Sequence, residues 1–191
     1  MNKKDDKEYY SYLKNRSLTG LIYRKFYLYP VLSLFLKGKV LDVGCGIGDF
    51  LSFKKEAYGI DINKDNVMYC KNKDLNASLM QEDIIPFDDS SFDSAIIDNV
   101  IEHIVCPKKL LKELNRVLSS DGFLVIGVPG VKGFKSDPDH KKYYDINSLT
   151  KTLEDAEFKL IRSFNMPIDI EFPTNFLSQH CLYAIYKKFN W

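Results

Sequence analysis

From residue 39 onward, short hydrophobic runs alternate with stretches in which hydrophobic residues recur every three or four positions. The runs KVLDVG, AYGID, ASLMQED, FDSAIID and FLVIGVP are mostly hydrophobic, which is typical of strands buried on both faces of a sheet. The spacing in PKKLLKELNRVLSSDG places its leucines on one face of a helix that Pro107 opens. This alternation predicts an α/β fold with a doubly wound, mostly parallel sheet and helices on both faces.

The two ends of the chain add further elements. The segment YYSYLKNRSLTGLIYRKFYLYPVLSLFL has helical spacing, and we expect one or two helices there, the second of which starts or kinks at Pro30. The stretch INSLTKTLEDAEF predicts a helix with Asn147 or Ser148 as its N-cap. FKLIRSF and CLYAIYKKF are rich in aromatic and β-branched residues, so they predict two more strands, which bring the sheet to seven.

Composition and charge narrow the class of protein. A chain of 191 residues, 45% hydrophobic and 28% charged, has the size and composition of one globular domain. The net charge of +1 argues against a dedicated nucleic-acid binder, although residues 1–38 carry eight Lys or Arg against three acids. No hydrophobic run is as long as a membrane span and the start is polar, so we expect a cytoplasmic protein. The four cysteines form no C-x-x-C pair, so no metal site is predicted.

The stretch LDVGCGIGDF, residues 41–50, is where the sequence points to chemistry. Gly44, Gly46 and Gly48 stand between Asp42 and Asp49, directly behind a predicted strand. The missing side chains expose backbone N–H groups and let a ligand lie against the main chain. A tight strand-to-helix turn also needs glycine for steric reasons, so this motif alone is weak evidence for a cofactor site.

The second predicted strand ends in Asp61, which strengthens the evidence. An acid at this place in a β-α-β unit can accept hydrogen bonds from ribose hydroxyls. A dinucleotide would bring a pyrophosphate to the loop, whereas S-adenosylmethionine would bring a sulfonium, an ammonium and a carboxylate. The spacing G-x-G-x-G departs from the dinucleotide fingerprint, and Asp42 and Asp49 would repel a pyrophosphate. The acids therefore favour the cationic cofactor.

With these motifs the sequence resembles the class I S-adenosylmethionine-dependent methyltransferases of the small single-domain type. The pieces VLDVGCGIGDFL, AYGIDIN, QEDIIPFDDSSFDSAIIDNVIEHI and LLKELNRVLSSDGFLVIGVP match that family in order and spacing. The resemblance implies one Rossmann-like domain over residues 1–191, with an N-terminal helical lid (1–36) and a core (37–191). It implies S-adenosyl-L-methionine as the cofactor and S-adenosyl-L-homocysteine as the product. One departure is SSDG, where the family often has Pro-Gly-Gly.

The resemblance also assigns cofactor-binding positions. The loop would line the methionine and ribose side of the cofactor through Asp42, Gly44, Cys45, Gly46 and Gly48, with Asp61 on the ribose hydroxyls. Asp83 would meet the adenine amino group, and Ile62 and Ile84 would sandwich the ring. Asp98 and Asn99 would contact the methionine end.

Catalytic residues are the least determined part of such a site. Methyl transfer from a sulfonium needs a base only when the acceptor is a weakly acidic hydroxyl or a charged amine. His103 and His140 follow predicted strand ends on the cofactor side, and each can act as a general base near neutral pH. His103 can equally be a structural residue packed under the cofactor. Tyr144, in the polar loop of His140, completes the candidate catalytic set.

The acceptor itself stays open at this stage. We expect oxygen, ahead of nitrogen or carbon, on a small molecule or glycan precursor, because DNVI stands where amino-methylating enzymes have an NPPY-type tetrapeptide. The basic, aromatic N-terminal helices suit an anionic acceptor or a weak contact with a membrane surface, although a solvated basic face explains the same bias. A non-catalytic S-adenosylmethionine-binding sensor or partner subunit is the main alternative, and a nucleotide-dependent oxidoreductase is a third. The oligomeric state does not follow from the sequence.

Overall fold

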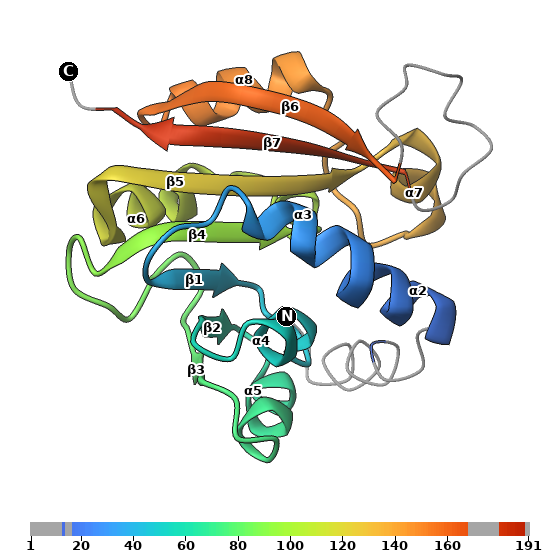
Figure 1. Ribbon diagram of the computed structural model, residues 1–191. Coiled ribbons are helices and arrows are strands. Elements are labelled where there is room, and N and C mark those ends of the chain that lie inside the picture. Colours follow the sequence, from blue (N-terminus) through green and yellow to red (C-terminus); the bar gives the residue numbers. More distant parts are fainter. Residues whose placement is uncertain (1–12, 14–16, 168–179, 190–191) are drawn as a thin grey trace.

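The computed structural model describes residue 13, residues 17–167 and residues 180–189, and it contains one seven-stranded sheet (Figure 1). The strand order is β3-β2-β1-β4-β5-β7-β6. Strands β1 to β5 pair in parallel, and β7 pairs antiparallel with both of its neighbours. The strands are β1 (Val40–Val43), β2 (Tyr58–Asp61), β3 (Ala77–Leu79), β4 (Phe92–Asp98), β5 (Leu118–Pro129), β6 (Phe158–Met166) and β7 (Cys181–Lys188). The predicted mostly parallel, doubly wound sheet is confirmed.

Helical segments cover both faces of this sheet, as predicted (Figure 1). One core cluster packs leucines of α6 and α8 against the sheet, and a second packs side chains of η1, α3, α4 and α5 against its other face. The described helices are α2 (Leu18–Tyr23), the π-helical turn η1 (Arg24–Leu28), α3 (Tyr29–Ser33), α4 (Asp49–Phe53), α5 (Lys64–Lys71), the 3₁₀ turn η2 (Ile101–His103), α6 (Lys108–Val117), α7 (Val131–Ser136) and α8 (Ile146–Glu154).

The direction of winding reverses between β1 and β4. From β1 the chain moves outward through β2 to β3, then returns to place β4 on the other side of β1. β1 is buried along its whole length, because neighbouring strands flank it and helices cover it. Ligands of open α/β sheets bind at such a reversal, beside the carboxyl ends of the strands. The topology alone therefore predicts a ligand site beside the carboxyl ends of β1 and β4.

The N-terminal helices form one nearly continuous segment, α2-η1-α3, that crosses in front of the sheet in Figure 1. Ser17 caps α2 by accepting a hydrogen bond from the Gly20 N–H at 3.2 Å. Pro30 lies in the first turn of α3, in agreement with the predicted second helix. The predicted lid, residues 1–36, is described only in part, since residues 1–12 and 14–16 lie outside the described residues.

Two local predictions differ from the structure. The N-cap of α8 is Asp145, whose side chain accepts from Ser148 N–H at 2.8 Å, while the Ser148 hydroxyl accepts from Asp145 N–H. This capping box begins the helix earlier than the predicted Asn147 or Ser148. The third strand ends at Leu79, so Asp83 lies in a turn, with φ at 60°, and not at a strand end.

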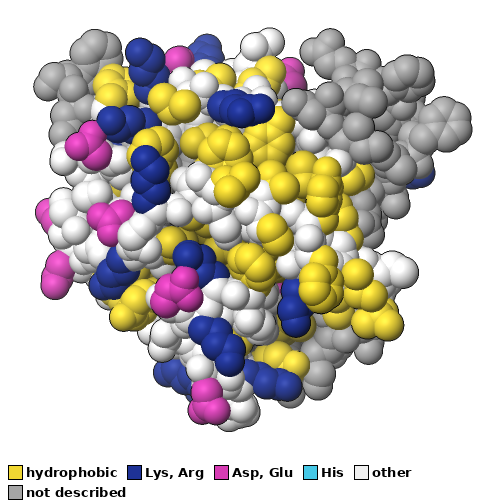
Figure 2. Space-filling view, in the orientation of Figure 1, with side chains coloured by type: hydrophobic (Ala, Val, Ile, Leu, Met, Phe, Trp, Pro, Cys, Tyr) yellow, Lys and Arg dark blue, Asp and Glu magenta, His cyan; other side chains and the backbone are white. Residues whose placement is uncertain are grey.

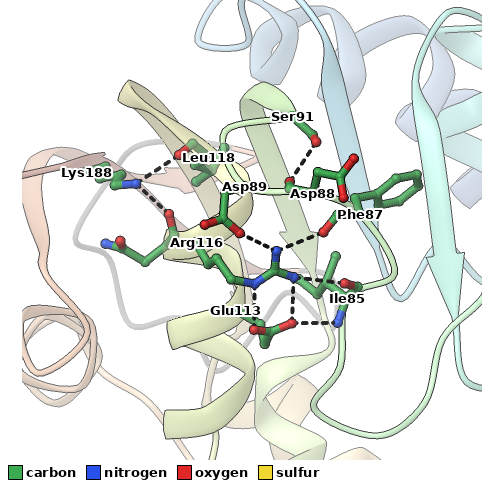
Figure 3. A network of polar contacts seen from close by, with 10 residues as sticks. Ile85, Phe87, Asp88, Asp89, Ser91, Glu113, Arg116, Leu118 and Lys188 are labelled. Carbon is green, nitrogen blue, oxygen red and sulfur yellow. Dashed lines mark hydrogen bonds and ion pairs between the residues drawn. The ribbon is translucent and has the colours of Figure 1, made fainter.

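An arginine-centred network fixes the loop that follows β3 (Figure 3). Arg116 on α6 donates to the carbonyl oxygens of Ile85 at 3.0 Å and Phe87 at 2.8 Å, and it pairs with Asp89 at 2.8 Å. Glu113, one turn earlier on α6, binds the same guanidinium at 2.8 Å and accepts from the Ile85 N–H at 3.1 Å. Because the guanidinium is planar and has five N–H donors, it can hold all these oxygens at once. The network attaches the β3–β4 loop to α6.

A hydrophobic stripe runs along the outer side of α2-η1-α3. Leu18, Ile22 and Phe26, each four residues after the last, are 72%, 50% and 70% exposed, and Leu34 beyond α3 is 77% exposed. Figure 2 shows hydrophobic side chains gathered on this face, with Lys and Arg side chains between them. No helix in the described part of the chain is long and apolar enough to cross a membrane.

Candidate active site

A cavity of about 480 Å³ opens at the carboxyl ends of β1, β4 and β5, where the winding of the sheet reverses. Segments from the whole chain contribute to it, from the N-terminal helices to β7. Its described lining residues are Leu13, Ser17, Gly20, Leu21, Tyr23, Arg24, Leu28, Tyr29, Asp42, Gly44, Cys45, Gly46, Asp49, Phe50, Ile96, Asp98, Asn99, His103, Pro129, Gly133, Ser136, Asp137, His140, His180, Cys181 and Tyr183.

The glycine loop follows β1 into this cavity and requires glycine at each of its three spaced positions. Gly44, Gly46 and Gly48 have φ values of 74°, 54° and 78°, which residues with a side chain rarely adopt. A Cβ at Gly44 would lie 2.5 Å from a methyl group of Val100. Leu13, from the N-terminal segment, lies so close to Gly46 that a Cβ there would be 3.2 Å from it. Gly44 and Gly46 line the cavity, whereas Gly48 packs over Cys70 and Leu75 beneath the loop.

The cavity is rich in carboxylates. Asp42, Asp49, Asp98 and Asp137 line it, and Arg24 is the only Lys or Arg among its described lining residues. Burial raises the pKa of Asp42 well above its usual value, and the charges of Asp98 and Asp61 raise it further. A cation in the cavity would lower the pKa of Asp42 again, since a positive charge stabilises the ionised carboxylate.

Arg24 reaches into the site from η1 and pairs with Asp98 at the end of β4. Its Nη1 lies 2.9 Å from Asp98 Oδ2. The other Asp98 oxygen accepts from the Tyr183 hydroxyl and from the Asn99 side-chain amide, both at 2.8 Å. Burial alone would lower the pKa of Arg24, but Asp98, with Tyr29 and Tyr183, holds it above its usual value. The sequence pointed to Asp98 and Asn99 but not to Arg24 or Tyr183.

Asp61 supports the glycine loop from below. One of its oxygens accepts from the Gly46 N–H at 2.8 Å and the other from the Asn63 N–H at 2.7 Å. The side chain is buried and does not line the cavity. Its assignment to the ribose therefore stays a prediction, while its contact with the loop is a structural role that the sequence did not indicate.

The residues assigned to adenine are not among the described lining residues of the cavity. Ile62, directly after β2, is 46% exposed, and Ile84, in the loop after β3, is 52% exposed. Asp83 precedes Ile84 in the same half-exposed turn. Two exposed isoleucines on neighbouring connections offer apolar surface of the kind that a flat ring could cover. The Arg116 network holds the loop that carries Asp83 and Ile84.

The two candidate histidines lie together on the cavity wall. The ring centroids of His103, in η2, and His140, after α7, are 4.7 Å apart. Glu102, which the sequence analysis did not single out, lies beside them, with Oε1 3.8 Å from His140 Nε2. A lone acid inside the hydrophobic run VIEHIV is the signal that could have found it. Tyr144 is 2% exposed and does not line the cavity, so its catalytic role also stays a prediction.

Comparisons with known proteins point to methyltransferases. Residues 41–126 match a family model described as a methyltransferase domain. A probable S-adenosylmethionine-dependent methyltransferase of Mycobacterium tuberculosis is 27% identical over 131 residues, which are 62% of this chain and 48% of that protein. An uncharacterized protein of Methanocaldococcus jannaschii is 30% identical over 122 residues, 64% of this chain and 58% of that protein. The chain thus spans about half the length of these curated relatives.

Solved structures show the same fold. A SAM-dependent methyltransferase from Archaeoglobus fulgidus superposes with a TM-score of 0.70 at 23% identity and covers 90% of this chain and 100% of that one. A methyltransferase chain in a complex with the Haloferax volcanii Trm112 methyltransferase activator gives a TM-score of 0.75 at 16% identity, with 96% and 98% covered. Together with the match over residues 41–126, these findings show that the chain has the fold of S-adenosylmethionine-dependent methyltransferases and contains a segment similar to a methyltransferase domain.

Proposed function

We propose that this chain is an enzyme that transfers a methyl group from S-adenosylmethionine to an oxygen atom of a small molecule or glycan precursor. The observation that carries the proposal is the acidic cavity at the reversal of the sheet, where Asp42, Asp49 and Asp98 face one arginine, Arg24. This charge suits a sulfonium and an ammonium group, and it disfavours a pyrophosphate. The similarity to methyltransferases and the charge of the cavity therefore support the same cofactor.

The residues present fit S-adenosylmethionine. Gly44 and Gly46 leave open backbone along one wall of the cavity, and the exposed Ile62 and Ile84 provide apolar surface for the adenine ring. Arg24 is the described residue that can pair with the methionine carboxylate. When bound, the cofactor supplies an activated methyl group and leaves as S-adenosylhomocysteine.

The chain itself would contribute position, shielding from water and a proton acceptor. Leu13 covers Gly46, and the α2-η1-α3 segment forms one wall of the cavity, in line with the proposed lid. Such a cover holds the two reactants in register and strengthens electrostatic interactions inside. His103 and His140 line the same cavity, so either imidazole can take the proton of an acceptor hydroxyl as the carbon–oxygen bond forms. An oxygen acceptor is the case in which such a base is useful.

Isothermal titration calorimetry with S-adenosylmethionine and NAD⁺ tests the cofactor assignment. We expect wild-type protein to bind S-adenosylmethionine and not NAD⁺. Asp42→Asn keeps the shape of a buried lining residue and removes its charge, so it should weaken S-adenosylmethionine binding about tenfold, or about 1.4 kcal/mol. Asp121→Asn is the matched control, since Asp121 is exposed near the opposite end of β5, where it pairs with Lys187.

Tighter binding of NAD⁺ than of S-adenosylmethionine would instead support an oxidoreductase. Equal affinities of wild type and Asp42→Asn would contradict the charge argument. Turnover is then measured as S-adenosylhomocysteine released in the presence of hydroxyl-bearing acceptors. Cofactor binding without release of S-adenosylhomocysteine on any acceptor would favour the non-catalytic sensor.

Contact of the exposed α2-η1-α3 stripe with a membrane surface is also a proposal, supported by Phe26 and its apolar neighbours.

A further inference from the structure

Three side chains with metal-binding atoms converge on the cavity wall. Glu102 and His103 belong to η2, and His140 belongs to the loop after α7. One such atom from each residue lies within 4.8 Å of those of the other two. His140 Nε2 lies 3.8 Å from Glu102 Oε1. Both histidines line the cavity, so the cluster borders the space in which an acceptor would lie.

The Glu102 carboxylate is buried and is not satisfied by hydrogen bonds from the described residues. Glu102 is 0% exposed, and neither of its carboxylate oxygens has a hydrogen-bond partner there. Burial raises the pKa of Glu102 to about 8. A carboxylate buried without hydrogen bonds is costly unless it is paired with a cation or binds a metal. The side chain is nevertheless aimed at two imidazoles, which are metal ligands when neutral.

The Nδ1 atom of each histidine contacts a backbone carbonyl oxygen. His140 Nδ1 lies 2.9 Å from the carbonyl oxygen of Phe134, and His103 Nδ1 lies 3.3 Å from that of Asp139. An Nδ1–H that donates to a carbonyl leaves the Nε2 lone pair free, which is the usual arrangement behind a metal-bound histidine. Phe134 also stacks on the His140 ring at 5.3 Å and restricts its rotation.

Backbone contacts hold the two halves of the cluster together. The carbonyl oxygen of Glu102 accepts from the N–H groups of Lys141 at 2.8 Å and Lys142 at 3.0 Å. These bonds attach the loop that carries His140 to the turn that carries Glu102 and His103. The ligand atoms are therefore positioned by the fold itself, as a preformed site requires.

We propose that Glu102, His103 and His140 bind a divalent transition-metal ion, for which Zn²⁺ is the best match. Two imidazoles and one carboxylate are the protein ligands of a common type of catalytic zinc site, which keeps a further position open. Zinc-bound nitrogen and oxygen atoms at tetrahedral angles lie about 3.4 Å apart. The 3.8 Å pair would therefore contract by about 0.4 Å, and the other two pairs, which lie within 4.8 Å, by at most about 1.4 Å. The sequence predicted no metal site, because the ligands come from two distant segments.

The role of the metal rests on the proposed function, but its binding does not. In a methyltransferase, the open position would hold the acceptor oxygen and lower the pKa of its hydroxyl group. His103 and His140 would then act as ligands, and the hydroxyl proton would leave to solvent instead of to an imidazole. The inference therefore selects acceptors with an oxygen that can coordinate a metal.

Metal binding is tested on tag-free protein that has been treated with a chelator and dialysed. We expect calorimetry and elemental analysis to show one Zn²⁺ per wild-type chain, and Co²⁺ to give the visible absorption bands of a site with nitrogen and oxygen ligands. Glu102→Gln and His140→Gln should each weaken Zn²⁺ binding about 100-fold or more, since each removes one ligand. Mg²⁺ at the same concentration should not displace Zn²⁺, because imidazole disfavours it.

His180→Gln is the matched control, because His180 is a buried histidine that lines the same cavity outside the cluster. It should keep the full zinc content. Glu102→Gln keeps the volume of the side chain and replaces a buried carboxyl group that has no hydrogen bond among the described residues, so its melting temperature without metal should not fall. Absence of stoichiometric Zn²⁺ in wild type would overturn the proposal, and so would a zinc affinity in Glu102→Gln and His140→Gln equal to that of wild type. Zinc binding without turnover would contradict only the proposed function, and turnover by metal-free protein would contradict only the metal's role.

Discussion

At the scale of single residues, Asp98 shows how one side chain can join distant parts of the chain. It accepts from Arg24 of the N-terminal helices at 2.9 Å and from Tyr183 of β7 at 2.8 Å. Its own side chain is only 11% exposed, so the ion pair is partly desolvated. Removing one partner of such a pair costs more than the pair itself contributes, because the other charge is left in a poor environment.

Arg24→Met therefore should destabilise the fold through the uncompensated charge on Asp98. We expect the free energy of unfolding to fall by about 1–3 kcal/mol, measured by urea denaturation at neutral pH, which is less than for a fully buried pair. The double variant with Asp98→Asn should recover part of this loss. Lys25→Met, a change at an exposed neighbour in the same turn, should have little effect. Equal losses for Arg24→Met and Lys25→Met would contradict the argument.

The sequence indicated the place of single residues best where local backbone rules determine it, although their roles toward a cofactor stay predictions. Gly44 and Gly46 were predicted from a strand-to-helix turn, and the structure places both on the cavity with positive φ. Arg24, Glu102 and Tyr183 were not found, because their importance depends on partners far away in the sequence. Nothing in the pattern around an isolated arginine on a basic helix says which carboxylate it will meet.

At the scale of elements, the helix α6 does more than cover the sheet. Arg116 and Glu113 on its last turns hold the β3–β4 loop at Ile85, which follows Ile84 directly. Arg116 in turn lowers the pKa of Glu113 below its usual value. The apolar surface proposed for adenine thus depends on a contact outside the cavity (Figure 3).

Arg116→Met should weaken S-adenosylmethionine binding several-fold, because it frees a loop that must be ordered in the complex. Calorimetry measures the binding enthalpy and the affinity together. Their change from wild type to Arg116→Met reports the ordering of the loop that binding then requires. Lys188→Met is the matched control, since Lys188 donates to the carbonyl oxygens of Asn115 and Leu118 at the same end of α6 without touching the loop. A comparable loss of affinity in both variants would indicate general destabilisation in place of loop ordering.

Elements were predicted well where hydrophobic spacing is long and regular. The leucines of α6 and the strands β6 and β7 were found from their patterns. The ends of elements were predicted less well, because several polar residues within one turn are suitable N-caps. The N-cap of α8 is Asp145 and not Asn147 or Ser148. Asp145 and Ser148 form a reciprocal pair of hydrogen bonds, which hydrophobic spacing alone does not reveal.

At the scale of the molecule, the sheet order brings together residues from the first helices to the last strand around one cavity. The alternation of strands and helices predicted this class of fold, and the seven-stranded sheet confirms it. The sequence could not predict which loops meet over the cavity, since that depends on long-range packing. A ligand held by all these segments should stabilise them as a unit.

Hydrogen exchange with and without saturating S-adenosylmethionine tests this coupling. We expect slower exchange at residues 18–28, 44–50 and 181–183 together, since all three contribute to the cavity lining. Residues 119–122, near the amino end of β5, should not change. Protection confined to the glycine loop would show that the N-terminal helices and β7 are not part of the binding unit.

The position of β7 between β5 and β6 has a consequence for synthesis of the chain. Among the described strands, β7 leaves the ribosome last, yet it must enter the sheet between two strands made earlier. Until then, β6 has no neighbour in the sheet, and Asp98 lacks the Tyr183 hydroxyl. A nascent chain that already contains the glycine loop is therefore still an incomplete receptor. The complete cavity, with the Tyr183 hydroxyl on Asp98, therefore exists only after β7 has been inserted between β5 and β6.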